Sequence, residues 1–160
     1  MAQAPKNPAN GANLSYFILE GILVGKAGGS RFHLLALSGG GTGSTKNQPN
    51  FGGGFYPYLQ GQKTTGSGAN HQHGGPIPAG EYIIHGPQQN AHLGLSAYLE
   101  PAPGNSMLGR DGFYIHGRGP HGSDGCIVPL ESFQELMTAL QKDGTGTLFV
   151  EESTGAARFA

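Results

Sequence analysis

This chain of 160 residues has little of several features that proteins commonly use for stability or function. It has one cysteine, Cys126, no tryptophan, and only 12% charged residues. A single cysteine excludes an intrachain disulfide and a zinc site built from several thiolates. With a formal net charge of −1, the chain also lacks the basic excess that nucleic-acid binding requires, so nucleic acid is not an expected partner.

Long hydrophobic runs are also missing. No run approaches the about 20 residues that cross a bilayer, so no membrane span is expected. The longest, residues 14–24, contains Glu20 and is preceded by a single basic residue, Lys6, which makes it a poor signal peptide. The sequence therefore predicts a protein that is made in the cytoplasm without a signal peptide.

Glycine is what the chain has in excess. Its 30 glycines and 11 prolines make up a share of the chain typical of low-complexity segments. However, the net charge is too small to keep the chain open, and Leu, Ile, Val and Phe cluster in short runs. The glycines concentrate in residues 39–86 and 104–125. We therefore expect one folded domain with long loops, and not a helical bundle, because glycine destabilises helices.

Alternation of apolar and polar residues predicts several short strands. They are residues 14–24, 31–38, 81–85, 92–99, 112–116 and 147–152. The first two should form a hairpin. An apolar repeat at helical spacing between Pro129 and Gly144 predicts one helix over 131–142. The fold class that follows is mainly β, a sandwich or barrel with one helix near its C-terminal end.

The domain organisation follows from the same pattern. Residues 1–13 are expected to be a flexible N-terminus, 14–152 a single domain, and 153–160 a flexible tail. Residues 39–75 are too long for an ordinary connection, whose median length is about 4–6 residues. They are expected to form a functional loop or a capping subdomain.

Most of the residues that could take part in catalysis lie close to Cys126 in the sequence. A strand is expected to end at His116, and Cys126 follows after a glycine-rich turn that can fold the chain back on itself. A thiol, a nearby imidazole and backbone N–H groups are the parts that cysteine acyl transfer needs. The N–H groups of Gly125 and Cys126 are candidate oxyanion donors. A neighbouring imidazolium would also lower the pKa of the thiol below its free value of about 8.5.

Two stretches resemble a known family. The His-Gly pair at His116 followed by Ser-Asp-Gly-Cys-Ile resembles the active-site motif of L,D-transpeptidases, the YkuD-type catalytic domain. The sequence GGPIPAGEYII, residues 74–84, resembles the strand that precedes that motif in the family. The short spacing from His to Cys is similar to a divergent branch that includes peptidoglycan-targeting effectors of type VI secretion systems. The resemblance implies an L,D-transpeptidase-like β fold for residues 14–152.

The resemblance also implies roles for individual residues. Cys126 matches the nucleophile and His116 the general base, whose second ring nitrogen would be oriented by the backbone carbonyl of Gly117. Gly125 matches the glycine before the nucleophile. Ser123 matches the hydroxyl residue three positions before it. No cofactor and no metal are implied.

The chain departs from the family pattern at two positions. Asp124 stands where the family has a histidine, and Val128 stands where it has an arginine. Val128 cannot bind a substrate carboxylate as the family arginine does, and Arg118 or Arg110 could substitute for it. Asp124 either forms the local turn or tunes the charge near the thiol.

Two further residues have two open interpretations. His121 either contacts substrate or is a solvated loop residue. Tyr114 should share a face with His116, because side chains alternate along a strand, and it either lines the cleft or packs in the core.

Taken together, the resemblance implies a cysteine-dependent L,D-carboxypeptidase or L,D-transpeptidase. It would remove or exchange the terminal D-Ala of peptidoglycan stem tetrapeptides through a thioacyl-enzyme, with water or an amine as acceptor. Without an export signal, it fits an antibacterial toxin that is secreted and acts in the periplasm of a target cell. Such a toxin implies a cognate immunity protein and a type VI secretion delivery component as partners.

Several alternatives stay open from sequence. Cys126 can be a small buried hydrophobe, and His116 a structural histidine. His71 and His73 form an HxH pair that, with other histidines, can hold a catalytic zinc, which gives a zinc-dependent cell-wall peptidase. A third reading is a non-catalytic wall-binding module.

Overall fold

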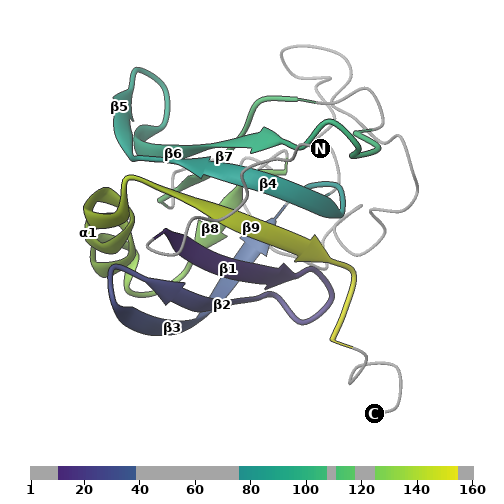
Figure 1. Ribbon diagram of the computed structural model, residues 1–160, viewed down its shortest axis with the longest axis horizontal. Coiled ribbons are helices and arrows are strands. Elements are labelled where there is room, and N and C mark those ends of the chain that lie inside the picture. The colour runs from purple at the N-terminus through teal and green to yellow at the C-terminus, as the bar shows by residue number, and fades with distance from the viewer. Residues whose placement is uncertain (1–10, 39–75, 108–110, 118–124, 155–160) are drawn as a thin grey trace, which may run out of the picture.

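The computed structural model describes four stretches of the chain. They are residues 11–38, 76–107, 111–117 and 125–154. These residues form nine strands and one helix (Figure 1). The elements are β1 (Ala12–Phe17), β2 (Ile22–Ala27), β3 (Ser30–Ser38), β4 (Gly80–His85), β5 (Gln88–Asn90), β6 (Gly94–Pro101), β7 (Phe113–His116), β8 (Ile127–Pro129), α1 (Phe133–Asp143) and β9 (Thr145–Glu151). In this part of the chain, no helix is long and apolar enough to cross a membrane.

The strands close into a barrel. Their order is β4-β9-β1-β2-β3-β8-β7-β6-β5, and an additional pairing between β4 and β6 completes a ring from which β5 projects. Closure pairs the backbone groups of the ring strands, which an open sheet would leave exposed at its edges. The predicted fold class, mainly β with one helix near the C-terminal end, is therefore confirmed.

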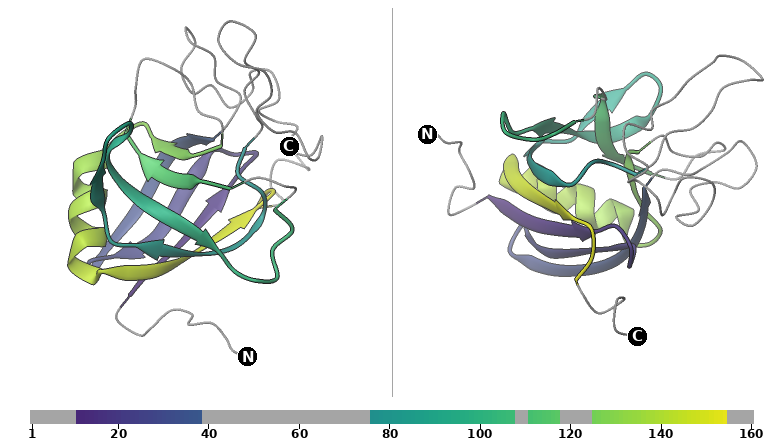
Figure 2. Two further views of the ribbon diagram at one scale, coloured as in Figure 1. Left: turned by 90° about the horizontal axis from the view of Figure 1, so that it is seen from above. Right: turned by 90° about the vertical axis from the view of Figure 1, so that its right-hand side faces the viewer.

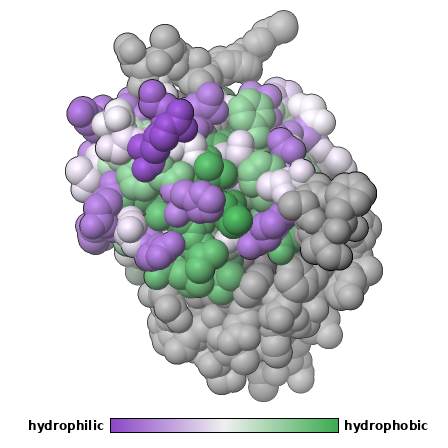
Figure 3. All heavy atoms as spheres, turned by 90° about the horizontal axis from the view of Figure 1, so that it is seen from below, coloured by the Kyte–Doolittle hydropathy of each residue, from purple (hydrophilic) through white to green (hydrophobic). Residues whose placement is uncertain are grey.

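Alternation along the strands builds the core. Side chains on the inner face of the barrel are almost completely buried, for example Leu14, Leu99, Ile115 and Ile127 at 0% exposure. On the side formed by β2 and β3, hydrophobic side chains lie among hydrophilic ones (Figure 3). Leu35 on β3 is an example of a large apolar side chain on the outside, with 52% exposure.

The helix closes one end of the barrel. In Figures 1 and 2, α1 lies at the end of the strands, between the β1–β3 side and the β6–β7 side. Its buried residues are Leu136, Met137, Ala139 and Leu140. The N–H of Gly144 donates to the carbonyl of Leu140 at 2.8 Å, and its φ of 78° ends the helix in the left-handed conformation. The helix predicted over 131–142 is therefore confirmed.

One predicted strand is wrong. Residues 14–24 form parts of two strands, β1 and β2, which pair antiparallel around a turn at residues 18–21. Gly21 supplies the turn with a φ of 67° and donates its N–H to the carbonyl of Phe17 at 2.8 Å. The apolar alternation runs through this turn, so it concealed the break. The hairpin between residues 14–24 and 31–38 is formed by β2 and β3.

Other boundaries also shift. β1 starts at Ala12, inside the predicted flexible N-terminus, and the short strands β5 and β8 were not predicted. At the other end, Ser153 and Thr154 donate their hydroxyl groups to the carboxylate of Glu20, at 2.9 and 2.7 Å. The predicted flexible tail therefore begins with two anchored residues. The predicted loop 39–75 lies outside the described residues.

Candidate active site

Two adjacent parallel strands carry the candidate nucleophile and base. β7 and β8 are in register at Ile115 and Ile127, which both face the core. His116 ends β7 and Cys126 immediately precedes β8. Each is one residue from a core-facing isoleucine, so both belong to the outward face of this strand pair.

His116 is buried, and a backbone carbonyl fixes the orientation of its ring. Its side chain is buried, with 9% exposure, and Nδ1 lies 2.7 Å from the carbonyl oxygen of Gly117. A carbonyl only accepts hydrogen bonds, so Nδ1 carries the proton and Nε2 keeps its lone pair. Burial lowers the pKa of His116 from its usual value of 6.5, against the opposing effect of the hydrogen bond to Gly117. The lowered pKa favours the neutral imidazole at pH 7, so His116 is not expected to be the resting cation that would lower the pKa of a thiol.

Cys126 is half-buried, and its thiol donates to the carbonyl oxygen of Gly112 at a sulfur–oxygen distance of 3.9 Å. Gly112 immediately precedes β7, and His116 ends it. Continuing the β7–β8 register by one residue sets Cys126 beside Tyr114, so it is diagonal to His116. The thiol is therefore directed to the Gly112 end of β7, and a reaction with His116 as base requires the side chain of Cys126 to turn toward the imidazole.

A buried serine fixes the backbone next to the thiol. The hydroxyl of Ser38, 2% exposed at the end of β3, donates to the carbonyl oxygen of Gly125 at 2.7 Å. The same hydroxyl accepts a hydrogen bond from the N–H of Ile77 at 3.0 Å. Gly125 has a φ of 128°, a conformation that side-chain-bearing residues rarely adopt. Ser38 therefore ties the residue before Cys126 to two other parts of the fold.

Sequence reasoning missed Ser38. The available signal was its position, because Leu34, Ala36 and Ser38 share the inward parity of β3 and all three are buried. A hydroxyl on an otherwise apolar face needs a hydrogen-bond partner when it is buried. The identity of that partner depends on contacts between distant segments, which the sequence does not display.

Two rows of side chains cross the outward face next to the site. In one row, Gln88 on β5 is opposite Ser96 on β6, which is opposite His116 on β7. In the other, Tyr98 on β6 is opposite Tyr114 on β7, beside Cys126. The prediction that Tyr114 shares a face with His116 agrees with this register. Tyr114 is half-buried on the outward side and not in the barrel core.

Several predicted site residues lie outside the described residues. They are Arg110, Arg118, His121, Ser123 and Asp124, together with His71 and His73 of the metal alternative. Val128, which replaces the family arginine, is fully buried at 0% exposure. Within the described stretches, no three His, Cys, Asp or Glu side chains are grouped closely enough to hold a metal ion.

No family model and no curated protein sequence matches the chain. Two solved structures are similar to it, each with 13% sequence identity. One is the L,D-transpeptidase of Xylanimonas cellulosilytica, with a TM-score of 0.49, over 92% of this chain and 64% of that chain. The other is the helical cell shape determining protein Pgp2 of Campylobacter jejuni, with a TM-score of 0.50, over 94% of this chain and 49% of that chain.

At 13% sequence identity, the likeness to these two structures concerns the path of the backbone. This chain spans about half of the length of Pgp2 and less than two thirds of the length of the transpeptidase structure. The similarity to Pgp2 extends over nearly all of this chain and shows that the two share a β fold.

Proposed function

We propose that the chain is a cysteine L,D-carboxypeptidase or L,D-transpeptidase that acts on peptidoglycan stem tetrapeptides. One observation carries the proposal. A buried, neutral imidazole and a half-buried thiol share the outward face of two neighbouring strands, and Nδ1 of the imidazole is held by Gly117 at 2.7 Å. That arrangement leaves Nε2 of His116 as the base for the Cys126 thiol.

The reaction follows from these groups. Nε2 of His116 takes the thiol proton, and the thiolate of Cys126 attacks the carbonyl carbon between the third residue and D-Ala. The N–H groups of Gly125 and Cys126 would stabilise the oxyanion, and the φ of Gly125 belongs to this proposed donor pair. The C–N bond then breaks, and the imidazolium returns its proton to the amine of the departing D-Ala.

A thioester then links the shortened stem to Cys126. Water can hydrolyse this thioester: His116 accepts a proton from the water, the water oxygen attacks the carbonyl carbon, and the thiolate of Cys126 leaves. An amine, such as a D-amino acid, resolves it in the same way with exchange or cross-linking. Both outcomes use the same base, so the acceptor is decided by what reaches the thioester.

The test is direct. Tetrapeptide muropeptides are incubated with the protein and with Cys126→Ala, and the products are weighed by mass spectrometry. We expect loss of D-Ala with the unchanged protein only, or mass exchange when a D-amino acid is supplied. An intact tetrapeptide in both samples contradicts the proposal. Product formation that a chelator abolishes and a thiol alkylator does not would favour the zinc alternative.

The biological role is part of the proposal. The resemblance to type VI secretion effectors supports an antibacterial toxin that acts in the periplasm of a target cell and is neutralised by an immunity protein. We expect expression to be harmless in the cytoplasm and toxic when a signal peptide directs the chain to the periplasm. Equal growth in both cases would contradict the toxin role while leaving the enzymatic proposal intact.

A further inference from the structure

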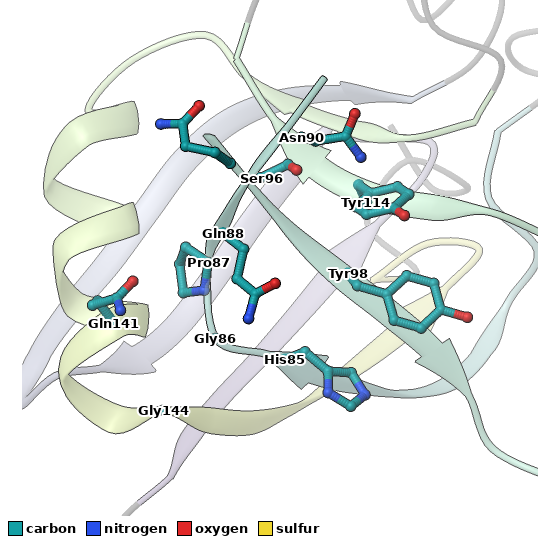
Figure 4. A pocket seen from close by; sticks show the side chains of 11 residues that line it. His85, Gly86, Pro87, Gln88, Asn90, Ser96, Tyr98, Tyr114, Gln141 and Gly144 are labelled. Carbon is teal, nitrogen blue, oxygen red and sulfur yellow. The ribbon is translucent and has the colours of Figure 1, made fainter. Parts of the chain in front are cut away.

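A polar hollow lies beside the candidate active site. It has a volume of about 580 Å³ and is formed by β5, β6, β7 and the C-terminal end of α1. Figure 4 shows Tyr98 and Tyr114 on one side of it and Gln141 of α1 on the other. Neither His116 nor Cys126 is among the residues that line it, so it is a separate feature of the surface.

The lining combines aromatic rings with amide groups. The rings of Tyr98 and Tyr114 have centroids 5.3 Å apart, and the ring of His85 is 5.5 Å from that of Tyr98. Four side-chain amides also line the hollow: Gln88, Gln89, Asn90 and Gln141. The glutamine amides each carry a donor and an acceptor, while Oδ1 of Asn90 already accepts the N–H groups of His92 and Leu93 and its NH₂ group is a donor.

Formal charge is scarce at this surface. The described residues that line the hollow include no Asp, Glu, Lys or Arg. The carboxylate of Glu100, outside the lining, binds Nε2 of His85 at 2.8 Å. A charged ligand such as a carboxylate-bearing peptide would have no fixed countercharge here. The chemistry that fits is a neutral ligand with hydroxyl and amide groups and an apolar face to stack on a ring.

The hollow lies next to the candidate site along the two rows of paired residues. Ser96 lines the hollow and lies directly opposite His116, and Tyr114 lines it and stands beside Cys126. Tyr98 is two strands away from Cys126, a distance of about 9–10 Å. Three residues of extended peptide span about 10 Å. A stem peptide with its third carbonyl at Cys126 therefore brings its attachment point to the edge of the hollow.

We propose that this hollow binds an N-acetylated sugar of the glycan strand that carries the stem peptide. This inference rests on the proposed function, because that function places the stem peptide at Cys126. A sugar ring stacks on Tyr98, of which 36% is exposed, and the amides of Gln88 and Asn90 bind its hydroxyl and acetamido groups. The protein would then hold its substrate at both the sugar and the peptide.

The experiment separates sugar binding from catalysis. The full chain carrying Cys126→Ala is titrated with tetra-N-acetylchitotetraose, a neutral sugar without peptide, and binding is followed by calorimetry and by NMR shifts of backbone amides. We expect saturable binding with shifts centred on β5 and β6. Adding Tyr98→Ala should weaken the affinity about fivefold to tenfold, the effect of losing one aromatic stacking contact.

Matched variants control for general damage. Phe149 on β9 has 37% exposure, nearly that of Tyr98, and lies outside the hollow, so Phe149→Ala should leave sugar affinity unchanged. Gln88 is exposed and carries no core contact, so Gln88→Ala should weaken binding even if Tyr98→Ala fails to fold. Absence of saturable binding, or equal affinity in Gln88→Ala and Phe149→Ala, overturns the inference.

The two proposals fail separately. If the unchanged protein removes D-Ala from a free tetrapeptide but the sugar does not bind, the sugar site is wrong and the enzymatic proposal stands. If the sugar binds with the expected variant pattern and no muropeptide is processed, the sugar site stands and the catalytic proposal is wrong.

Discussion

Two pairs of parallel strands, β1 with β9 and β7 with β8, interrupt the otherwise antiparallel pairing of the described strands. The first pair has six residues in register, from Ala12 with Gly146 to Phe17 with Glu151. The second has one, Ile115 with Ile127. The long ladder contributes buried contacts on its inner face, while the short one leaves its outward face to the candidate site. The longer parallel ladder and the candidate site thus belong to different strand pairs of the same barrel.

The largest effect should come from the short pair. Cys126→Ala removes the proposed nucleophile, and we expect loss of D-Ala release by at least about 10³-fold, as when other covalent enzymes lose theirs. The midpoint of thermal unfolding should hardly change, because the thiol is only half-buried. Turnover of muropeptides and calorimetric unfolding are measured on the same preparation. Retained turnover would contradict the role of Cys126.

The long pair should respond in the opposite way. A Cβ on Gly146 would lie 2.6 Å from Cβ of Ala12 and 2.8 Å from its carbonyl oxygen. Gly146→Val therefore forces β1 and β9 apart and should lower the free energy of unfolding by about 2–3 kcal/mol. The measurement is urea denaturation.

Gly104→Ala is the matched control for this change. A Cβ there meets nothing within 4 Å, so the free energy of unfolding should be unaffected. If Gly146→Val were as stable as Gly104→Ala, the β1–β9 ladder would not have the tight packing described here, and the contrast between the two strand pairs would be lost.

Ser38 should affect both properties, since it lies in the core and ties Gly125 in place. Ser38→Ala leaves the Gly125 carbonyl and the Ile77 N–H without this buried partner, a cost of about 1–3 kcal/mol. It should also slow turnover by loosening the backbone at the proposed oxyanion donors. Ser30→Ala, at the exposed start of the same strand, should change neither quantity. A stable Ser38→Ala variant with full turnover would show that the hydrogen bonds of Ser38 to Gly125 and Ile77 matter neither for stability nor for activity.

The smallest effect is a pH dependence from His116. Its pKa is lowered by burial in the folded state, while the unfolded chain protonates it at its usual pKa near 6.5. Between these two values the unfolded state binds more protons, so the free energy of unfolding declines as the pH falls from about 6.5 toward the lowered pKa. Above about pH 6.5 this group contributes no slope. Turnover should likewise decrease as the pH falls below 6.5 toward the lowered pKa, because the proposed base becomes protonated there.

Variants isolate this contribution. His116→Gln should flatten the decline in unfolding free energy on the acid side, and the exposed His33→Gln should leave it unchanged. An acid limb of the turnover profile above pH 6.5 would contradict a burial-lowered pKa at the catalytic base.

The sequence predicted those parts of the fold that depend on residues close together in the chain. The helix was predictable because Leu136, Met137 and Leu140 repeat along one face and Gly144 ends it. The break between β1 and β2 was not, because the turn has the apolar residues of a strand and depends on the single Gly21. β5 and β8 are three residues each, too short for alternation to indicate a strand.

The candidate site divides in the same way. Four residues of the candidate site are close in sequence, so a local motif was enough to predict them: His116, Gly117, Gly125 and Cys126. Gln88, Ser96 and Tyr98 joined the same surface only through pairings of β5, β6 and β7, which no local pattern encodes. Non-local contacts therefore hold the information that sequence reading lacked.

The pairing of Ala12 with Gly146 has a consequence for how the molecule forms. β1, β2 and β3 follow one another and can assemble early as a meander during synthesis, but the ring stays open until β9 has left the ribosome. Contacts between such distant segments slow folding, because the intervening chain must be ordered before they form. Until then β1 has an unpaired edge, and a nascent chain that stalls before residue 145 would expose it to aggregation or to chaperone capture.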